Sequence, residues 1–377
     1  MANLFLHKEI KNKSIVWFKN HNQYVVLEKS TALILKKLES KISIQEITKD
    51  LSKKLNIPYE TTFSFIQDIE NKLYLPNIKE INSLEENLSN NNLNTLFFIT
   101  KFYKINNLVF KIDFESEYEV YLIDPKFSHL TIENQSSFNF HYQIYTQENL
   151  TFLILDTVKI GSWIQEEIHY FQGKFSMMIT QNIHHKNEEK WMGVFHASAV
   201  SNGKKAVLFS GDSGNGKSTS LAILQANNFN CLADDFVPID IENKHVYSFP
   251  AAISIKKNSI PTLLPMYPEL ENSSEFHFKS LNKIVRFLKP HNRNNPNHLP
   301  CSDLVFIKYK KESSTEFNII SQAYAFEQLV PDSWISPIEK NAQIFLDWFT
   351  NLNCYQLTYS NNDEMIETVT KIFNDEL

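Results

Sequence analysis

The chain has 377 residues, a formal net charge of −6 and an isoelectric point near 6.1. At about 100–200 residues per domain, this length predicts more than one domain. Apolar residues make up 42% of the chain, which is enough for packed cores. The acidic balance disfavours general affinity for nucleic acid. The three cysteines, at positions 231, 301 and 354, fit neither a disulfide framework nor a zinc site.

The N-terminus lacks the apolar core of a signal peptide, and no run of about 20 apolar residues could span a bilayer. We therefore expect a soluble cytoplasmic protein that has neither a membrane nor a nucleic acid as its partner.

Residues 1–83 have the pattern of a small α+β module. Two β-rich runs, 14–18 and 23–27, are separated by a polar hairpin turn. Three helices should follow, at 30–38, 43–55 and 58–73. The first should begin at a capping Ser30 or Thr31, and the second has a Ser43–Glu46 capping box. The third should carry an apolar face.

The apolar positions in 26–35, 38–47 and the helix ending near Leu73 resemble the PqqD-like family of peptide-recognition modules. The resemblance implies a winged-helix-like fold in which a leader peptide adds as a strand to the sheet edge and lies against the third helix. A generic small helical or DNA-binding wing without a peptide ligand is the alternative. The Asn-rich stretch that follows is typical of a linker, so we place a linker at 84–95 and a second domain at 96–377.

The first part of this second domain has a β pattern. Candidate strands lie at 96–99, 108–112, 120–123, 140–145 and 150–155, and residues 160–181 are predicted to form a helix. His184 and His185 are adjacent, and neighbours on a chain rarely share a metal ion, so we interpret them as a solvated turn.

The strongest signal in the chain is a phosphate-binding loop. It matches the pattern Gly, four residues, Gly, Lys, then Ser or Thr, and consists of Gly211, Asp212, Ser213, Gly214, Asn215, Gly216, Lys217, Ser218 and Thr219. A short apolar run precedes it and a helical pattern follows it, so its backbone N–H groups would converge at a helix N-terminus. Three of the chain's seven glycines lie here, which indicates a demand on backbone geometry. Lys217 would reach the β- and γ-phosphates, and the Ser218 hydroxyl would ligate Mg²⁺.

Two further groups flank this loop in the sequence. His196 lies in an apolar run, 191–200, that should form a strand one Asn202-Gly203 turn before the loop strand. Asp234 and Asp235 end the next apolar run, which should form a second parallel strand with its carboxyl end beside the phosphates. One aspartate can hold Mg²⁺ or its water, and the other can accept a proton from an attacking hydroxyl.

His196-Ala197, the loop and Ala233-Asp234-Asp235, in this order, resemble HPr kinase/phosphorylase and its HPr kinase-like relatives. The resemblance implies an α/β P-loop kinase domain, a mixed sheet with flanking helices, that uses ATP and Mg²⁺ to phosphorylate serine on a peptide or protein. It implies that Asp235 is the proton acceptor and that His196 assists at the transferred phosphate; we assign Asp234 to the Mg²⁺ side.

The downstream Glu-Ile-Arg-Gly signature of the HPr kinases proper is absent from this sequence, so neither HPr as substrate nor the reverse reaction is implied. Segments 250–256 and 283–290 resemble those of kinase-like relatives found with peptide-maturation systems, and Arg286 is the candidate transition-state cation. The tail should supply strands at 302–307 and 354–359 and helices at 339–352 and 362–377.

The sequence thus favours a serine kinase whose N-terminal module holds the substrate, such as a ribosomally made precursor peptide; threonine remains a second possible acceptor. Two alternatives stay open: a non-catalytic ATP-binding peptide scaffold, and a small-molecule kinase built on the same core. Relatives of HPr kinase assemble, so a homo-oligomer is also possible.

Overall fold

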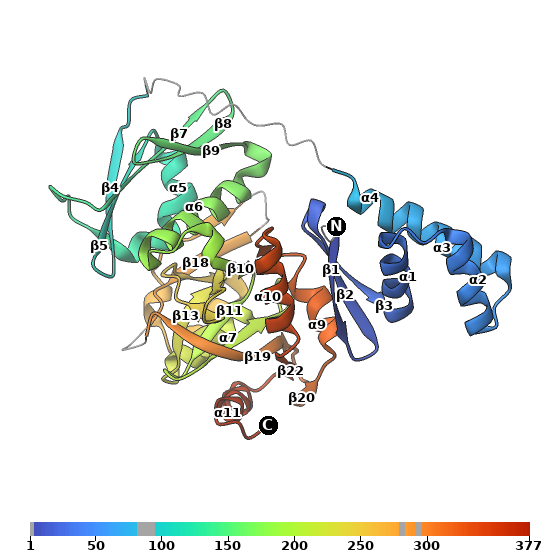
Figure 1. The fold of residues 1–377 in the computed structure, drawn as a ribbon. Coiled ribbons are helices and arrows are strands. Elements are labelled where there is room, and N and C mark those ends of the chain that lie inside the picture. The colour runs from blue at the N-terminus through green and yellow to red at the C-terminus, as the bar shows by residue number, and fades with distance from the viewer. Residues whose placement is uncertain (1–3, 81–94, 279–282, 292–295) are drawn as a thin grey trace.

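The computed structural model describes residues 4–80, 95–278, 283–291 and 296–377. It is a mixed α/β protein built on several sheets (Figure 1). The linker expected at 84–95 lies outside the described residues, except for Thr95. In the described ranges, no helix is both long enough and apolar enough to cross a membrane.

The N-terminal module starts with an antiparallel sheet in the order β1 (Phe5–Ile10), β2 (Lys13–Phe18) and β3 (Gln23–Glu28). Strands β2 and β3 and their turn confirm the prediction, whereas β1 was not predicted. The helices are α1 (Lys29–Glu39), α2 (Ile44–Leu55), α3 (Tyr59–Ile69) and α4 (Leu75–Ile78). A π-helical segment, Glu70–Tyr74, joins the last two. The Ser43–Glu46 capping box is present, but α1 is preceded by Glu28 and has no side-chain cap, so the predicted Ser30 or Thr31 cap is wrong.

The three-stranded sheet is covered on both faces. One face, including Val16 and Phe18, packs on α1 to α3. The other, including Ile15 and Trp17, joins the main core and faces α9 (Gln322–Leu329) and α10 (Glu339–Phe349). Figure 1 shows these two helices lying against β1–β3. The module is therefore docked on the C-terminal part of the chain through its sheet.

A second sheet of six strands has the order β6-β4-β5-β7-β8-β9. Its strands are β4 (Ile99–Ile105), β5 (Leu108–Phe114), β6 (Thr131–Ile132), β7 (Phe140–Gln147), β8 (Leu150–Leu155) and β9 (Val158–Ile164). The strand predicted at 120–123 is wrong: these residues belong to helix α5 (Glu117–Phe127), which begins at a Ser116–Glu119 capping box. The helix predicted from 160 is also wrong at its start, since β9 runs to Ile164 and α6 spans Ile168–His184.

The His184–His185 pair is only partly the solvated turn that was predicted. His185 is exposed and ends α6 in the left-handed conformation. His184 instead packs edge-on against Trp191 and Tyr247, and its Nε2 lies 2.8 Å from the Ser248 carbonyl oxygen. Burial lowers the pKa of His184 to about 4, so this imidazole is a neutral core group.

The central sheet has ten strands and carries the phosphate loop. On one side the order is β13-β11-β12-β19, with β22 and β20 beyond β19; on the other, β15, β14, β10 and β21 continue from β19. The strands are β10 (Trp191–Phe195), β11 (Ser198–Ser201), β12 (Ala206–Ser210), β13 (Asn230–Asp234), β14 (Val237–Asp240), β15 (His245–Tyr247), β19 (His298–Tyr309), β20 (Glu316–Ile319), β21 (Trp334–Ile335) and β22 (Asn353–Tyr359).

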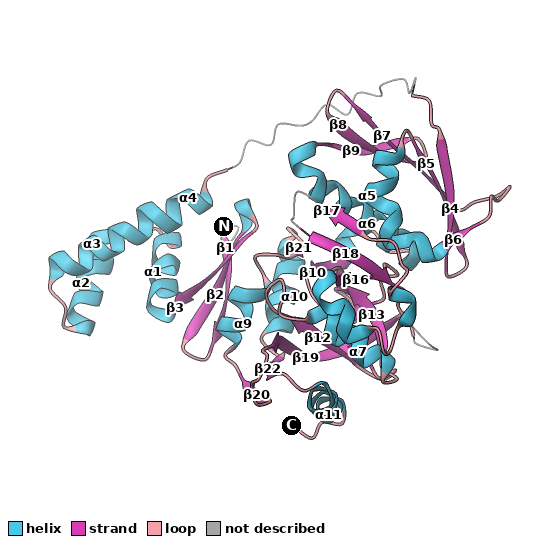
Figure 2. Cartoon of the chain, turned by 180° about the vertical axis from the view of Figure 1, so that it is seen from behind, coloured by secondary structure: helices cyan, strands magenta, loops and turns pink. Residues whose placement is uncertain are grey.

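Strands β12, β19 and β22 are parallel neighbours, whereas β11 is antiparallel to both β12 and β13. The strand after the loop helix is therefore parallel to β12, as predicted, but β11 separates the two. Along β12, Leu208 faces the main core, while Val207 and Phe209 face a second core with α7 (Lys217–Ala226) and α11 (Asn362–Phe373). This period of two places helices on both faces of the sheet (Figure 2).

A third, small sheet lies over the loop helix in the order β16-β18-β17. Its strands are β16 (Ile253–Lys256), β17 (Phe276–Phe278) and β18 (Lys283–Leu288), and a short helix, α8 (Ile260–Leu263), follows β16. Helix α5 of the six-stranded sheet reaches this region, because the Lys126 carbonyl accepts a 2.8 Å hydrogen bond from the Ala252 amide.

Candidate active site

The phosphate loop follows β12 and leads directly into α7. Gly216 is the residue before the helix, with φ 96° and ψ 12°, a left-handed conformation that suits glycine. Gly211 has φ 136°, and a Cβ added to it would lie 2.8 Å from the Ile307 carbonyl oxygen. The two glycines let the chain turn beside β19 and point the first amides of α7, which have no acceptor within the helix, at the loop interior.

The loop borders an open hollow with an empty volume of about 540 Å³. Lys217 is buried, and its ammonium donates back to the Gly211 carbonyl across the loop. The hollow is lined by residues 212–214 and 216–219 of the loop, and by His196, Asp235, Ser254, Lys256, Ser259 and Lys283. Every predicted loop residue except Gly211 and Asn215 therefore lines it, and Asn215 braces the loop because its carbonyl accepts from the Tyr309 amide at 2.9 Å.

Asp234 is buried behind the loop. Its Oδ1 accepts from the Ser198 hydroxyl at 2.6 Å and from the Ser218 hydroxyl at 3.2 Å, and its Oδ2 accepts from the Ser254 amide at 3.2 Å. Burial first, and then the charge of Asp235, raise the pKa of Asp234 to about 7. This carboxylate fixes the position of the Ser218 hydroxyl, which does face the hollow.

Asp235 turns away from its neighbour because its backbone is left-handed, with φ 61°. Aspartate tolerates this conformation better than most residues. The turn places its side chain on the hollow, so the two consecutive aspartates lie in different surroundings. Burial would raise the pKa of Asp235, but the charges of His196, Lys126, Lys283 and Lys217 outweigh burial and lower the pKa, so the group is a carboxylate at neutral pH.

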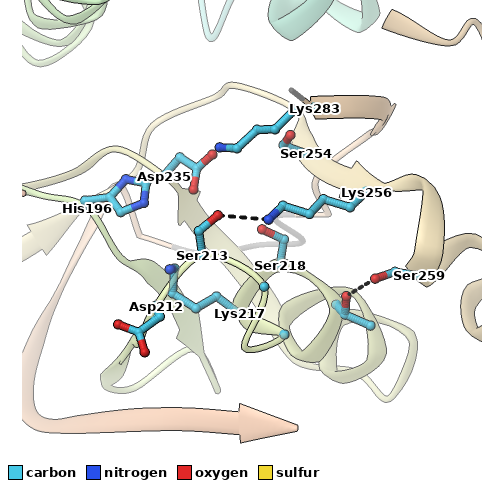
Figure 3. Close-up of a pocket in the computed structure, with 13 residues that line it drawn as sticks. His196, Asp212, Ser213, Lys217, Ser218, Asp235, Ser254, Lys256, Ser259 and Lys283 are labelled. Carbon is cyan, nitrogen blue, oxygen red and sulfur yellow. Dashed lines mark hydrogen bonds between the residues drawn. The ribbon is translucent and has the colours of Figure 1, made fainter. Parts of the chain in front are cut away.

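His196 was predicted to lie within a strand, and this prediction is wrong. The residue falls in a bend between β10 and β11, where the Ala197 amide donates to the Phe195 carbonyl at 2.9 Å. The strand register explains its position. Phe195 pairs with Val237 and Ser198 pairs with Asp234, so the strands before and after both segments end at the same place. The segments 196–197 and 235–236 therefore lie at the same place, and His196 and Asp235 lie next to each other on the hollow (Figure 3).

Arg286, the predicted transition-state cation, is not among the described residues that line the hollow. It lies in β18, and its guanidinium donates to the carbonyls of Leu270 and Glu271. Two lysines that sequence reasoning missed, Lys256 and Lys283, enter the hollow instead, from the side opposite the loop (Figure 3). The signal in the sequence was a lysine at the end of the apolar run 253–256 and another at the start of the run 283–288. Their facing positions come from the antiparallel pairing of these two strands.

The donor set of the hollow fits Mg²⁺ bound to a nucleotide. Mg²⁺ prefers oxygen ligands and keeps several waters, so that one or two protein oxygens and the phosphates suffice. The Ser218 hydroxyl faces the hollow and the Asp234 carboxylate stands directly behind it. Within the described ranges, no group of three or more His, Cys, Asp or Glu side chains could hold a metal ion.

No protein-family model matches this chain, and a search of curated proteins finds no match for it. Any assignment of function therefore rests on the loop and on the groups that the fold gathers around it.

Proposed function

We propose that the protein is an ATP- and Mg²⁺-dependent kinase that phosphorylates a serine hydroxyl of a peptide or protein. The observation that carries this proposal is the position of Asp235, an ionised carboxylate on the same hollow as the phosphate loop. A loop alone would indicate nucleotide binding. A carboxylate across from it adds a group that can remove a proton from an acceptor alcohol.

The reaction has a simple balance. The acceptor oxygen forms a bond to the γ-phosphorus, the bond from that phosphorus to the β–γ bridging oxygen breaks, and ADP leaves with the electron pair. The hydroxyl proton passes to the Asp235 carboxylate. Lys217 and the loop amides hold the phosphates, and bound Mg²⁺ would neutralise their charge through Ser218. His196 contacts the same space and is suited to contact the transferred group.

The N-terminal module is proposed to hold the substrate peptide. Its sheet ends at β3, which pairs only with β2 in the described part of the chain, so this edge can accept another strand. Helix α3 of the same module exposes Tyr59 and Phe65, at 42% and 52%. Holding the peptide on the same chain as the hollow raises its effective concentration at Asp235.

The test of transfer uses the full chain with ATP, Mg²⁺ and a candidate peptide, followed by intact mass. We expect one added phosphate. Asp235→Asn should slow transfer by about 10²–10⁴-fold, the usual contribution of a general base, with nucleotide affinity retained. Asp332→Asn changes an exposed aspartate outside the hollow and serves as the matched control.

Other results would redirect the proposal. ATP binding without transfer to any peptide would favour the peptide scaffold, and transfer to small alcohols alone would favour a small-molecule kinase. Peptide capture is tested separately by fluorescence anisotropy with a labelled peptide. Phe65→Ala should weaken binding, whereas Ile319→Ala, which removes a 78% exposed side chain from β20, should not.

A further inference from the structure

Lys256 contacts the phosphate loop from outside it. Its ammonium donates a 2.8 Å hydrogen bond to the Ser213 hydroxyl at the loop, and Figure 3 shows the side chain extending from β16 across the hollow. The pairing of β16 with β18 fixes the base of this side chain, since Lys256 lies opposite Val285 in the register. A half-buried cation is thus directed at the loop by a strand that is paired in a sheet.

The hollow holds more positive than negative charge close to this point. Lys217, Lys256 and Lys283 all line it, whereas the carboxylates on its lining are Asp235 and the exposed Asp212. Burial, followed by the charges of Lys283 and Lys217, lowers the pKa of Lys256. Within the described residues, the partner of its ammonium is a neutral hydroxyl. A group of cations with a neutral partner is suited to an anion that arrives with the ligand.

We propose that Lys256 binds the terminal phosphate of the nucleotide, and that Ser213 holds its ammonium until that phosphate takes the place of the hydroxyl. This inference rests on the nucleotide-binding role proposed above for the loop. Lys256 and Ser213 line the same hollow as Asp235, the group proposed to take the proton of the acceptor. The contact would therefore distinguish a triphosphate from a diphosphate.

The neighbouring lysines provide contrasts. Lys283 extends toward Asp235 (Figure 3). Its charge stabilises the ionised form of that carboxylate. Lys257, the next residue along the chain from Lys256, is exposed, does not line the hollow and lies 3.7 Å from Glu275. Lys257→Met is therefore a control of equal charge and size at the adjacent position.

The experiment compares the affinities of the full-length protein for ADP and for a β,γ-imido analogue of ATP, by calorimetry with Mg²⁺. A hydrogen bond from a charged group corresponds to about 10–100-fold in affinity. Lys256→Met should weaken analogue binding by that factor and ADP binding by less than about threefold, and Lys256→Arg should recover part of the loss. Lys257→Met should bind both nucleotides as the unaltered chain does. Thermal unfolding of each variant checks that it folds.

Ser213→Ala separates phosphate binding from loop bracing. If Lys256 binds phosphate, removal of the hydroxyl keeps the preference for the triphosphate. If Lys256 only braces the loop, Ser213→Ala and Lys256→Met lose affinity alike, for both nucleotides, and the inference is overturned. It is also overturned if Lys256→Met leaves both affinities unchanged. An unaltered chain that binds neither nucleotide overturns this inference and the proposed function together, whereas binding without transfer overturns the kinase alone.

Discussion

The phosphate-loop hollow and the docked face of the N-terminal sheet are built by opposite means. The hollow is polar, and its main parts come from one continuous stretch, from His196 to Lys256. Backbone conformation at glycines and one left-handed aspartate shapes it. The docked face is apolar and joins the two ends of the chain: Tyr24 packs edge-on against Phe345 with ring centroids 5.4 Å apart.

The difference separates what local sequence encodes from what only the folded chain assembles. A loop whose geometry is set by neighbouring residues appears as a motif. A face whose partner lies 313 residues away, as in the hydrogen bond from Asn22 to the Ile335 carbonyl, leaves no such pattern. One local signal did exist: β2 contains the apolar run Ile15-Val16-Trp17-Phe18, and strands that are apolar on both faces are buried on both.

The largest stability effect is expected at this docked face. Tyr24→Ala removes a ring that contacts Trp17, Phe326 and Phe345, and it should lower the free energy of unfolding by about 3 kcal/mol. The measurement is chemical unfolding followed by tryptophan fluorescence, with Trp17 as a reporter at the docked face. Limited proteolysis should show earlier cleavage between the module and the rest of the chain.

Tyr24→Phe is the matched control. The Tyr24 hydroxyl is buried and has no hydrogen-bond partner among the described residues, so its removal should leave stability unchanged or slightly raise it. If both variants destabilise the chain equally, the hydroxyl and not the ring holds the module in place.

A single methyl group added to the phosphate loop should lower both stability and nucleotide binding. Gly211→Ala forces a Cβ to 2.8 Å from the Ile307 carbonyl at φ 136°, so we expect a cost of about 1–3 kcal/mol and a loss of nucleotide binding. Gly173→Ala, in helix α6, adds a Cβ that meets nothing within 4 Å and should instead stabilise by about 0.5–1 kcal/mol. Differential scanning fluorimetry with and without ATP measures both. Equal shifts of the same sign in the two variants would contradict the backbone argument.

The same distinction accounts for what could be predicted from the sequence. The loop, its helix and the strand ending at Asp234 follow from patterns within a few residues of each other. The strand predicted at 96–99 lies too early in the chain, since β4 begins only at Ile99. Two other errors in the six-stranded sheet have local causes. Residues 120–123 are apolar enough for a strand, but the capping box at Ser116 starts a helix there. At 160–164 no start signal was present, and the helix begins only after the strand ends.

The residues that line the hollow from outside the loop leave a weaker signal in the sequence. Arg286, the predicted transition-state cation, instead donates to the carbonyls of Leu270 and Glu271. The register that brings Lys256 and Lys283 into the hollow depends on pairing between β16 and β18, which is not a sequence motif. Similarly, the bend that presents His196 exists because two pairs of strands separate at the same point.

The smallest effect is expected from the ion pairs at the edge of the docked face. Lys8 and Asp347 are 2.6 Å apart, with side chains 38% and 42% exposed, so solvent screens their attraction. A double-mutant cycle with Lys8→Ala and Asp347→Ala should give a coupling of about 0.2–1 kcal/mol that weakens further in high salt. The pair Lys72–Asp68 on one helix surface, at 3.0 Å, is the reference for an exposed contact and should give a similar value. A coupling at Lys8–Asp347 several times that of the reference would mean that charge, and not the apolar ring contacts of Tyr24, holds the module in place.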